Sequence, residues 1–177
     1  MFYKMIIILG CFISFAQAAL DIRNLETFTA NFIQNISSVS GKTIKYKGEV
    51  FIKNTGKILW KYKDPVEKNV FIINNFVIID EPELEQAIFT ELENEINIIK
   101  LLNTSTKVEE NTYLTKIDNT DYLILTKKDK NLISSIKYKD KLDNKIEIIF
   151  TNAIQNENID DTIFRFTAPD YYDIIRK

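Results

Sequence analysis

The sequence contains no histidine and only one cysteine, Cys11, in its 177 residues. Without histidine the chain lacks the side chain that titrates near neutral pH and the commonest metal ligand. A Ser-His-Asp or Cys-His catalytic unit is therefore excluded. A single cysteine also rules out an internal disulfide. We expect no catalytic residue, no metal site and no cofactor.

Glycine and proline are also scarce, at 4 and 3 residues, so few positions demand unusual backbone geometry. Basic and acidic residues number 23 and 25, which leaves a net charge of -2. A nucleic-acid-binding protein usually shows a basic excess or a basic stripe, and neither is evident. Hydrophobic residues make up 45%, enough for the core of one domain, which argues against disorder.

The first residues have the three parts of a secretory signal. A basic start at Lys4 precedes an apolar run from Met5 to Phe15, and Ala16-Gln17-Ala18 supplies small residues at a cleavage site. The apolar run is too short to span a bilayer. We therefore expect residues 1–18 to be a signal peptide and residues 19–177 to form a single exported domain. A retained membrane anchor is the less favoured alternative.

A second alternative concerns Cys11. The tetrapeptide Ile8-Leu9-Gly10-Cys11 resembles a lipoprotein processing site, at which Cys11 is acylated. The apolar run before Cys11 is very short, however, and apolar residues continue past it to Phe15. Cleavage after Ala18 is therefore the favoured interpretation.

Two stretches have the apolar spacing of an amphipathic helix. Residues 20–36 repeat apolar side chains at intervals of three and four, and so do residues 83–103, with Pro82 at the entrance of the second stretch. The spacing predicts a helix over each stretch, with room for a break in the middle of the second.

The remaining segments are predicted to be strands joined by short turns. Asn54-Thr55-Gly56-Lys57 and Asn74-Asn75 favour hairpin turns, and Pro65 ends a strand because proline cannot donate to a ladder. The predicted strands cover residues 46–53, 58–63, 70–73, 76–79, 113–117, 122–126, 132–138, 146–150 and 163–166. Short connections indicate an antiparallel sheet, and a curved sheet with helices on one face is the natural packing.

Charges on the predicted strands indicate which face of the sheet is interior. Lys61 and Lys63 need water, and strand alternation then turns Ile58, Trp60 and Tyr62 inward. By the same alternation the inward residues of the preceding strand are Gly48, Val50 and Ile52. Alternation alone does not distinguish a filled interior from a hollow one.

Five short segments occur in an order that covers nearly all of the chain after the signal. They are Phe28–Gln34, Tyr46–Lys53, Trp60–Pro65, Asp80–Gln86 and Ile163–Pro169. Their patterns begin with F-x-A-x-F-x-Q, end with F-x-F-x-x-P, and resemble those of LolA, the family of outer-membrane lipoprotein carriers. Each pattern alone is weak, but five in order behind an export signal are specific.

The resemblance implies an α+β fold, in which an open, strongly curved antiparallel β-barrel, or half-barrel, is covered by α-helices with a hydrophobic cavity between them. It implies a periplasmic chaperone that takes acylated lipoproteins from an inner-membrane ABC transporter of the LolCDE type to the outer membrane, with or without an acceptor there. Carriers of this kind are expected to be monomers. The residues assigned to the acyl chains are Phe28, Phe32, Val50, Ile52, Ile58, Trp60, Tyr62, Phe71, Leu84 and Ile88.

The sequence departs from the family pattern just after the first predicted strand. Many relatives carry Arg-Pro there, and the arginine bonds to the helical lid when the cavity is closed. The spacing back from Trp60 places Asn54 at that position, followed by Thr55. Asparagine cannot make the bidentate charged contact of arginine. Lys53 and Asn54 are therefore the candidates for the lid latch.

Two other functions are considered. The first is a membrane-anchored acceptor of the same fold, the LolB type, acylated at Cys11. The second is a periplasmic hydrolase, whose acid-base pair would come from Asp80, Glu81, Glu83 and Glu85. A solvated turn and helix start explains those acids better, because acids are favoured near the positive end of a helix dipole.

Overall fold

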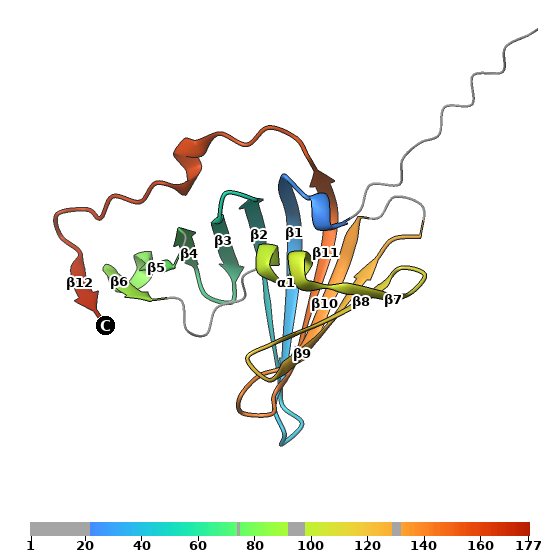
Figure 1. Ribbon diagram of the computed structural model, residues 1–177. Helices are drawn as coiled ribbons and strands as arrows, with labels where there is room; N and C mark the ends of the chain where they lie inside the picture. The colour runs from blue at the N-terminus through green and yellow to red at the C-terminus, as the bar shows by residue number, and fades with distance from the viewer. Residues whose placement is uncertain (1–21, 74, 92–97, 129–131) are drawn as a thin grey trace, which may run out of the picture.

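The computed structural model describes residues 22–73, 75–91, 98–128 and 132–177 (Figure 1). The predicted signal peptide and Cys11 lie outside these residues. The strands of the described part are β1 (Thr27–Ser37), β2 (Thr43–Lys53), β3 (Lys57–Asp64), β4 (Lys68–Ile73), β5 (Phe76–Glu81), β6 (Gln86–Glu91), β7 (Thr106–Glu109), β8 (Thr112–Ile117), β9 (Thr120–Thr126), β10 (Ile133–Lys139), β11 (Lys145–Gln155) and β12 (Asp173–Arg176). Its helical elements are the 3-10 turns η1 (Ile22–Asn24), η2 (Pro82–Leu84) and η3 (Asp161–Phe164) and the α-helix α1 (Ile98–Thr104).

The strands form one open sheet, in the order β12-β6-β5-β4-β3-β2-β1-β11-β10-β9-β8-β7. β12 and β7 are its two edges, so the sheet does not close on itself, and Figure 1 shows it curving around α1. Neighbouring strands are antiparallel, except that β12 pairs in parallel with β6. The predicted open antiparallel half-barrel is confirmed. The predicted cover of several helices is reduced, in the described residues, to the seven residues of α1.

The predicted helix over residues 20–36 is wrong for most of its length, because β1 begins at Thr27 and lies in the middle of the sheet between β2 and β11. Phe28, Phe32 and Ile36 are four residues apart, and four is also an even number, so the same side chains share one face of a strand. The intervals therefore fitted both periods. Two long partner strands favour the extended form over the helix.

The predicted helix over residues 83–103 is also wrong in its first half. After η2, the chain forms β6, which pairs with β5 from Phe76↔Glu91 to Glu81↔Gln86. Of the described residues in this stretch, those in α-helix are Ile98 onward, in α1. Tertiary pairing again outweighs local spacing. No helix in the described residues is long and apolar enough to cross a membrane.

The end of the chain differs from prediction in the same way. Residues 163–166 were expected to form the last strand, but Asp161–Phe164 is the 3-10 turn η3, and the last strand is Asp173–Arg176. Residues 156–172, which we call the C-terminal strap, connect β11 to β12 across the sheet (Figure 1). The strap carries its apolar side chains onto the sheet without adding a strand there.

Apolar side chains cover both faces of the sheet. We call the face under α1 the inner face and the face under the strap the outer face. On β3, Ile58 and Trp60 belong to the inner cluster with α1, whereas Leu59 between them belongs to the outer cluster with the strap residues Ile159 and Phe164. The predicted inward direction of Ile58, Trp60 and Tyr62 is confirmed, and so is that of Val50 and Ile52. Leu59 is equally buried because the strap covers the other side.

Candidate functional site

The inner face is a continuous apolar surface built by strands from both halves of the sheet. The buried residues from β1 to β5 are Phe28, Ala30, Phe32, Val50, Ile52, Ile58, Trp60, Val70, Ile72 and Val77. Those from β8 to β11 are Tyr113, Ile124, Ile133, Ile136, Ile146, Ile148 and Phe150. Alternation within each strand aims every second side chain at this face, and the pairing of β1 with both β2 and β11 joins the two halves.

Aromatic rings form the centre of this surface. The ring of Phe32 meets Trp60 edge to face at 5.0 Å and Tyr62 at 5.1 Å. Phe28 meets Phe150 edge to face at 5.2 Å. Large rings offer much apolar area with little demand on the shape of what they contact. Such a surface can hold a hydrocarbon chain without a defined polar anchor.

Helix α1 covers the inner face with its own apolar side. Ile98, Leu101 and Leu102 are buried in the same cluster as the sheet residues. The end of the helix is tied to β8 by a hydrogen bond between the Thr104 and Thr115 hydroxyls, whose oxygen atoms lie 2.7 Å apart. This contact involves neither predicted latch residue, and nothing in the local sequence of either threonine indicates it.

The inner face is closed in this structure. Ile58 and Ile52 are 0% exposed, Phe32 is 1% exposed and Trp60 is 4% exposed. A ligand can therefore reach these side chains only if a covering element moves. Because α1 is a short segment resting on the sheet through three buried side chains and the Thr104–Thr115 bond, it is the described element best suited to move.

The structure gathers most of the predicted acyl-binding residues at this site. Phe28, Phe32, Val50, Ile52, Ile58, Trp60 and Tyr62 all contact the inner cluster. Ile88, on β6, is half-buried and pairs with Ile79 toward the inner side. Two predicted residues lie elsewhere. Phe71 faces the outer side, where its ring is 5.6 Å from that of Phe166, and Leu84 in η2 is 65% exposed.

Sequence reasoning missed the second half of the site. Ile136, Ile148 and Phe150 complete the inner face on β10 and β11. Alternation with the polar neighbours Lys137, Glu147 and Thr151 was available as a partial signal, but Ile149 between Ile148 and Phe150 is apolar as well. The signal pointed to a face only once β11 was known to lie beside β1.

The two latch candidates lie near the strap. The Lys53 ammonium donates to the carbonyl oxygen of Ile159 at 3.1 Å and to the Asp161 carboxylate at 2.6 Å, while Lys57 reaches the other Asp161 oxygen at 2.8 Å. The backbone N–H of Asn54 donates to the carbonyl of Glu26. In this closed state Lys53 fastens the strap to the outer face, and the hydroxyl contact that ties α1 to the sheet is made elsewhere.

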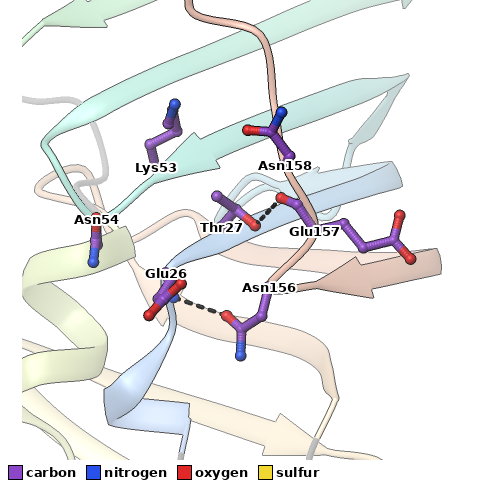
Figure 2. A pocket seen from close by; sticks show the side chains of 7 residues that line it. All are labelled: Glu26, Thr27, Lys53, Asn54, Asn156, Glu157 and Asn158. Atoms are coloured by element: carbon purple, nitrogen blue, oxygen red, sulfur yellow. Dashed lines mark hydrogen bonds between the residues drawn. The ribbon is translucent and has the colours of Figure 1, made fainter.

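A recess of about 480 Å³ lies at this end of the sheet. Figure 2 shows the side chains that line it. Polar side chains line it, namely Glu26, Thr27, Lys53, Asn54, Asn156, Glu157 and Asn158. The backbone N–H of Glu26 donates to the Asn156 side chain at 2.8 Å, and the Thr27 hydroxyl donates to the carbonyl of Glu157. These bonds hold the start of β1 to the start of the strap. The lining is too polar for an acyl chain.

The acidic cluster considered for a hydrolase does not line the inner face. Asp80 is buried on the outer side and accepts from the Asn69 amide at 2.9 Å, and Glu81 accepts from the Gln86 amide. Glu83 and Glu85 lie at η2 and are exposed. In the described part of the chain no three Asp, Glu, His or Cys side chains are placed to hold a metal ion.

We predict that the attachment of the strap depends on pH. Hydrogen bonds from Lys53 and Lys57 lower the pKa of Asp161 from 3.8 to about 2. A pKa lowered in the folded state stabilises the fold above the ordinary value, and that contribution is lost as the pH falls from 3.8 towards 2. Asp161→Asn should therefore loosen the strap at neutral pH, and its difference from the unmodified chain should shrink as the pH falls through about 2 and vanish below it.

Hydrogen exchange of residues 156–166 measures this effect. Asp170→Asn, which removes the charge of an exposed aspartate on the same strap, is the matched control and should leave exchange unchanged. Equal protection in the Asp161→Asn variant and the unmodified chain at neutral pH would contradict the role given to the two lysines.

The family model and the relatives matched by sequence agree on one family. The model of the outer membrane lipoprotein carrier protein LolA matches residues 23–167. An outer-membrane lipoprotein carrier protein of Wolinella succinogenes is 35% identical over 162 residues, 92% of this chain and 94% of the relative. One of Campylobacter jejuni is 35% identical over 158 residues, 89% of this chain and 90% of the relative.

One solved structure, an uncharacterized conserved protein from Thermus thermophilus, matches with a TM-score of 0.55 at 8% identity. The match covers 90% of this chain and 95% of that one, which shows a shared fold. The fold leaves function open, but the family model spans most of the chain and the two carrier sequences match along nearly their whole length. The chain therefore belongs to the LolA family of outer-membrane lipoprotein carrier proteins.

Proposed function

We propose that this protein is a periplasmic chaperone that carries the acyl chains of lipoproteins on its inner face, beneath α1. The observation that carries the proposal is the uninterrupted apolar surface shared by both halves of the open sheet and covered by a short helix. The names of the relatives support a carrier over a membrane-anchored acceptor.

The energetics of the task match such a surface. Each methylene group of an acyl chain gains about 0.8 kcal/mol when it leaves water. A lipoprotein bears several acyl chains, so a carrier must offer apolar area comparable to what the membrane provides. The buried side chains of the inner face and of α1 supply this area. In the closed state they pack against one another.

Release of the cargo requires an unfavourable free energy that offsets part of this affinity. Opening the closed inner face exposes apolar side chains of α1 and the sheet, so part of the binding free energy is spent on opening. Transfer then runs downhill to any acceptor that binds the acyl chains more tightly. The carrier needs no nucleotide or other fuel of its own for this step.

The finer parts of the proposal follow the family. The carrier receives its cargo from an inner-membrane ABC transporter of the LolCDE type, crosses the periplasm as a monomer and delivers the cargo to the outer membrane. Residues 1–18 act as the export signal. The absence of histidine supports binding rather than acid-base catalysis as its activity.

The sole tryptophan gives a direct test of where the cargo binds. Trp60 lies on the inner face between Phe32 and Phe150, so a bound acyl chain must come close to its indole ring. We expect fatty-acyl chains labelled with bromine to quench the fluorescence of Trp60 in a saturable way. An unlabelled acylated lipoprotein should compete and restore it.

A second variant controls for nonspecific binding. Trp60→Phe combined with Phe51→Trp moves the fluorophore to the outer face, where Phe51 is half-buried near Leu59 and the strap. Because the sheet then separates the indole from the inner face, quenching should disappear while unlabelled lipoprotein still binds. Equal quenching of both positions, or none at Trp60, would overturn the proposed site.

A further inference from the structure

One end of the sheet carries two hairpin tips that lie side by side. Residues 38–42 connect β1 to β2, and residues 140–144 connect β10 to β11. The two tips are neighbours because β1 and β11 stay paired to their ends, with Ser37 opposite Lys145. Figure 1 shows both hairpins projecting at the lower end of the sheet, well beyond α1.

Each tip presents an apolar side chain to solvent. Val39 and Leu142 are both 77% exposed, and Ile44, at the base of the first tip, is 52% exposed. The second turn is held in shape by the Asp140 carboxylate, which accepts from the backbone N–H groups of Leu142 at 2.8 Å and Asn144 at 2.9 Å. Leu142 is therefore displayed by an ordered turn.

The first turn is closed in a comparable way. The backbone N–H of Ser38 donates to the carbonyl of Lys42 at 2.8 Å, and that of Gly41 donates to the carbonyl of Ser38 at 2.9 Å. Val39 lies within this turn, with its side chain exposed. Each of the two ordered turns therefore holds one exposed aliphatic side chain that can insert into an apolar environment outside the protein.

Lysines surround the two apolar tips. The exposed ones are Lys42, Lys45, Lys139, Lys141 and Lys145. The acidic residues on the same turns are Asp140, whose carboxylate is committed to its turn, and Asp143. Asp118 and Asp121 belong to the next hairpin, and Asp64 is paired with Lys47 at 3.0 Å. The tips are basic on a chain whose net charge is -2, which complements an anionic surface.

The tips also adjoin the inner face. Ile36 on β1 lies opposite both Ile44 and Ile146, so a row of apolar side chains leads from the first tip to the buried cluster. Half-buried tyrosines continue the row: Tyr46 and Tyr62 meet at 5.8 Å, and Tyr122 and Tyr138 meet at 4.9 Å. Tyrosine is favoured where an apolar phase meets water. This end of the inner face therefore has the side chains expected at an opening between an apolar interior and water, and we call it the mouth of the inner face.

We propose that the β1–β2 and β10–β11 tips dock the protein on an anionic phospholipid bilayer, with Val39 and Leu142 inserted and the lysines on the headgroups. The docking brings the mouth of the inner face to the membrane. The use of this contact for loading or delivery rests on the proposed carrier function, although the contact itself does not require cargo.

Co-sedimentation with vesicles tests the docking. We expect the purified chain to bind vesicles of phosphatidylglycerol and phosphatidylcholine in equal parts, and to bind phosphatidylcholine vesicles far more weakly. Val39→Ser with Leu142→Ser should weaken binding by about tenfold or more, because both side chains lose their apolar contact. Lys42→Ser and Lys45→Ser should weaken it by about fivefold each, and high salt should weaken it further.

Matched substitutions at the other end of the sheet serve as controls. Phe76→Ser removes a 67% exposed aromatic residue beside the β4–β5 turn, and Lys127→Ser with Lys128→Ser removes two exposed charges after β9. These variants should bind vesicles like the unmodified chain. Thermal unfolding of every variant should be unchanged, because all the replaced side chains are exposed.

The outcomes separate docking from carrying. Undiminished vesicle binding by the tip variants, or no preference for the anionic vesicles, would overturn the docking proposal. So would a dimer that the tip substitutions dissociate in the absence of any vesicle binding. Quenching of Trp60 by brominated acyl chains is measured in the same variants. If the unmodified chain shows no quenching, the carrier function is contradicted. Vesicle binding tests the tips alone.

Discussion

Thr104→Cys together with Thr115→Cys is expected to block acyl uptake under oxidising conditions and to restore it on reduction. The two hydroxyl oxygens are 2.7 Å apart, so sulfur atoms in their places come within reach of a disulfide bond of about 2.05 Å. The bond would fix the end of α1 to β8. Since the buried side chains of the inner face are reached only by moving a cover, the locked protein should stay closed.

The expected effect is a fall of at least about tenfold in the rate at which brominated acyl chains quench Trp60, because the open state is removed from the equilibrium. Cys11 is replaced by serine in every variant, so that no other thiol is present. Each single cysteine variant is a control and should load normally with or without oxidant. Normal uptake by the oxidised double variant would show that α1 is not the element that opens.

Gly48→Ala is expected to cause a large loss of stability. A β-carbon at Gly48 would collide with the carbonyl oxygen of Lys61 on β3 and lie 2.8 Å from the Cε1 atom of Phe32. Neither neighbour can retreat. The Lys61 carbonyl belongs to the backbone of a central strand, and the ring of Phe32 is held by Trp60 and Tyr62.

We expect Gly48→Ala to lower the free energy of unfolding by about 3 kcal/mol, the upper end of the typical range when a packed core is overfilled. Gly41→Ala is the matched control. A β-carbon there meets nothing within 4 Å, but the residue has a φ of 85°, so its cost should be about 1–2 kcal/mol from backbone strain alone. Denaturant unfolding compares the two, and equal losses would show that the contact at Gly48 relaxes freely.

The hairpins at residues 43–64 and 68–81 could be predicted because their turn residues and their alternation agree. The same alternation, read with Lys61 and Lys63 on β3, identified which side chains face inward. Residues 20–36 and 83–103 could not be assigned in this way. Apolar side chains four residues apart satisfy the period of a strand as well as that of a helix. Local spacing also carries no information about pairing with distant strands, which decides between the two.

Phe71 illustrates the limit for the site. Its neighbours Val70 and Ile72 are as apolar as it is, so the sequence shows no difference between the two faces of β4. The outer face is covered only because residues 156–172 return over it, held by Asp161 on Lys53 and Lys57 and by Phe164 and Phe166 on the sheet. The sequence pattern around β4 does not indicate that a segment about 85 residues later will cover one of its faces.

The sequence by itself determined the family, the antiparallel sheet and most of the apolar residues of the inner face, because turn chemistry, alternation and ordered motifs are local properties. Only the tertiary structure decided that residues 27–37 are the central strand, that α1 closes the inner face through Thr104 and Thr115, and that the strap occupies the outer face. These features depend on contacts between segments far apart in the chain, whose free energies appear only when the segments meet.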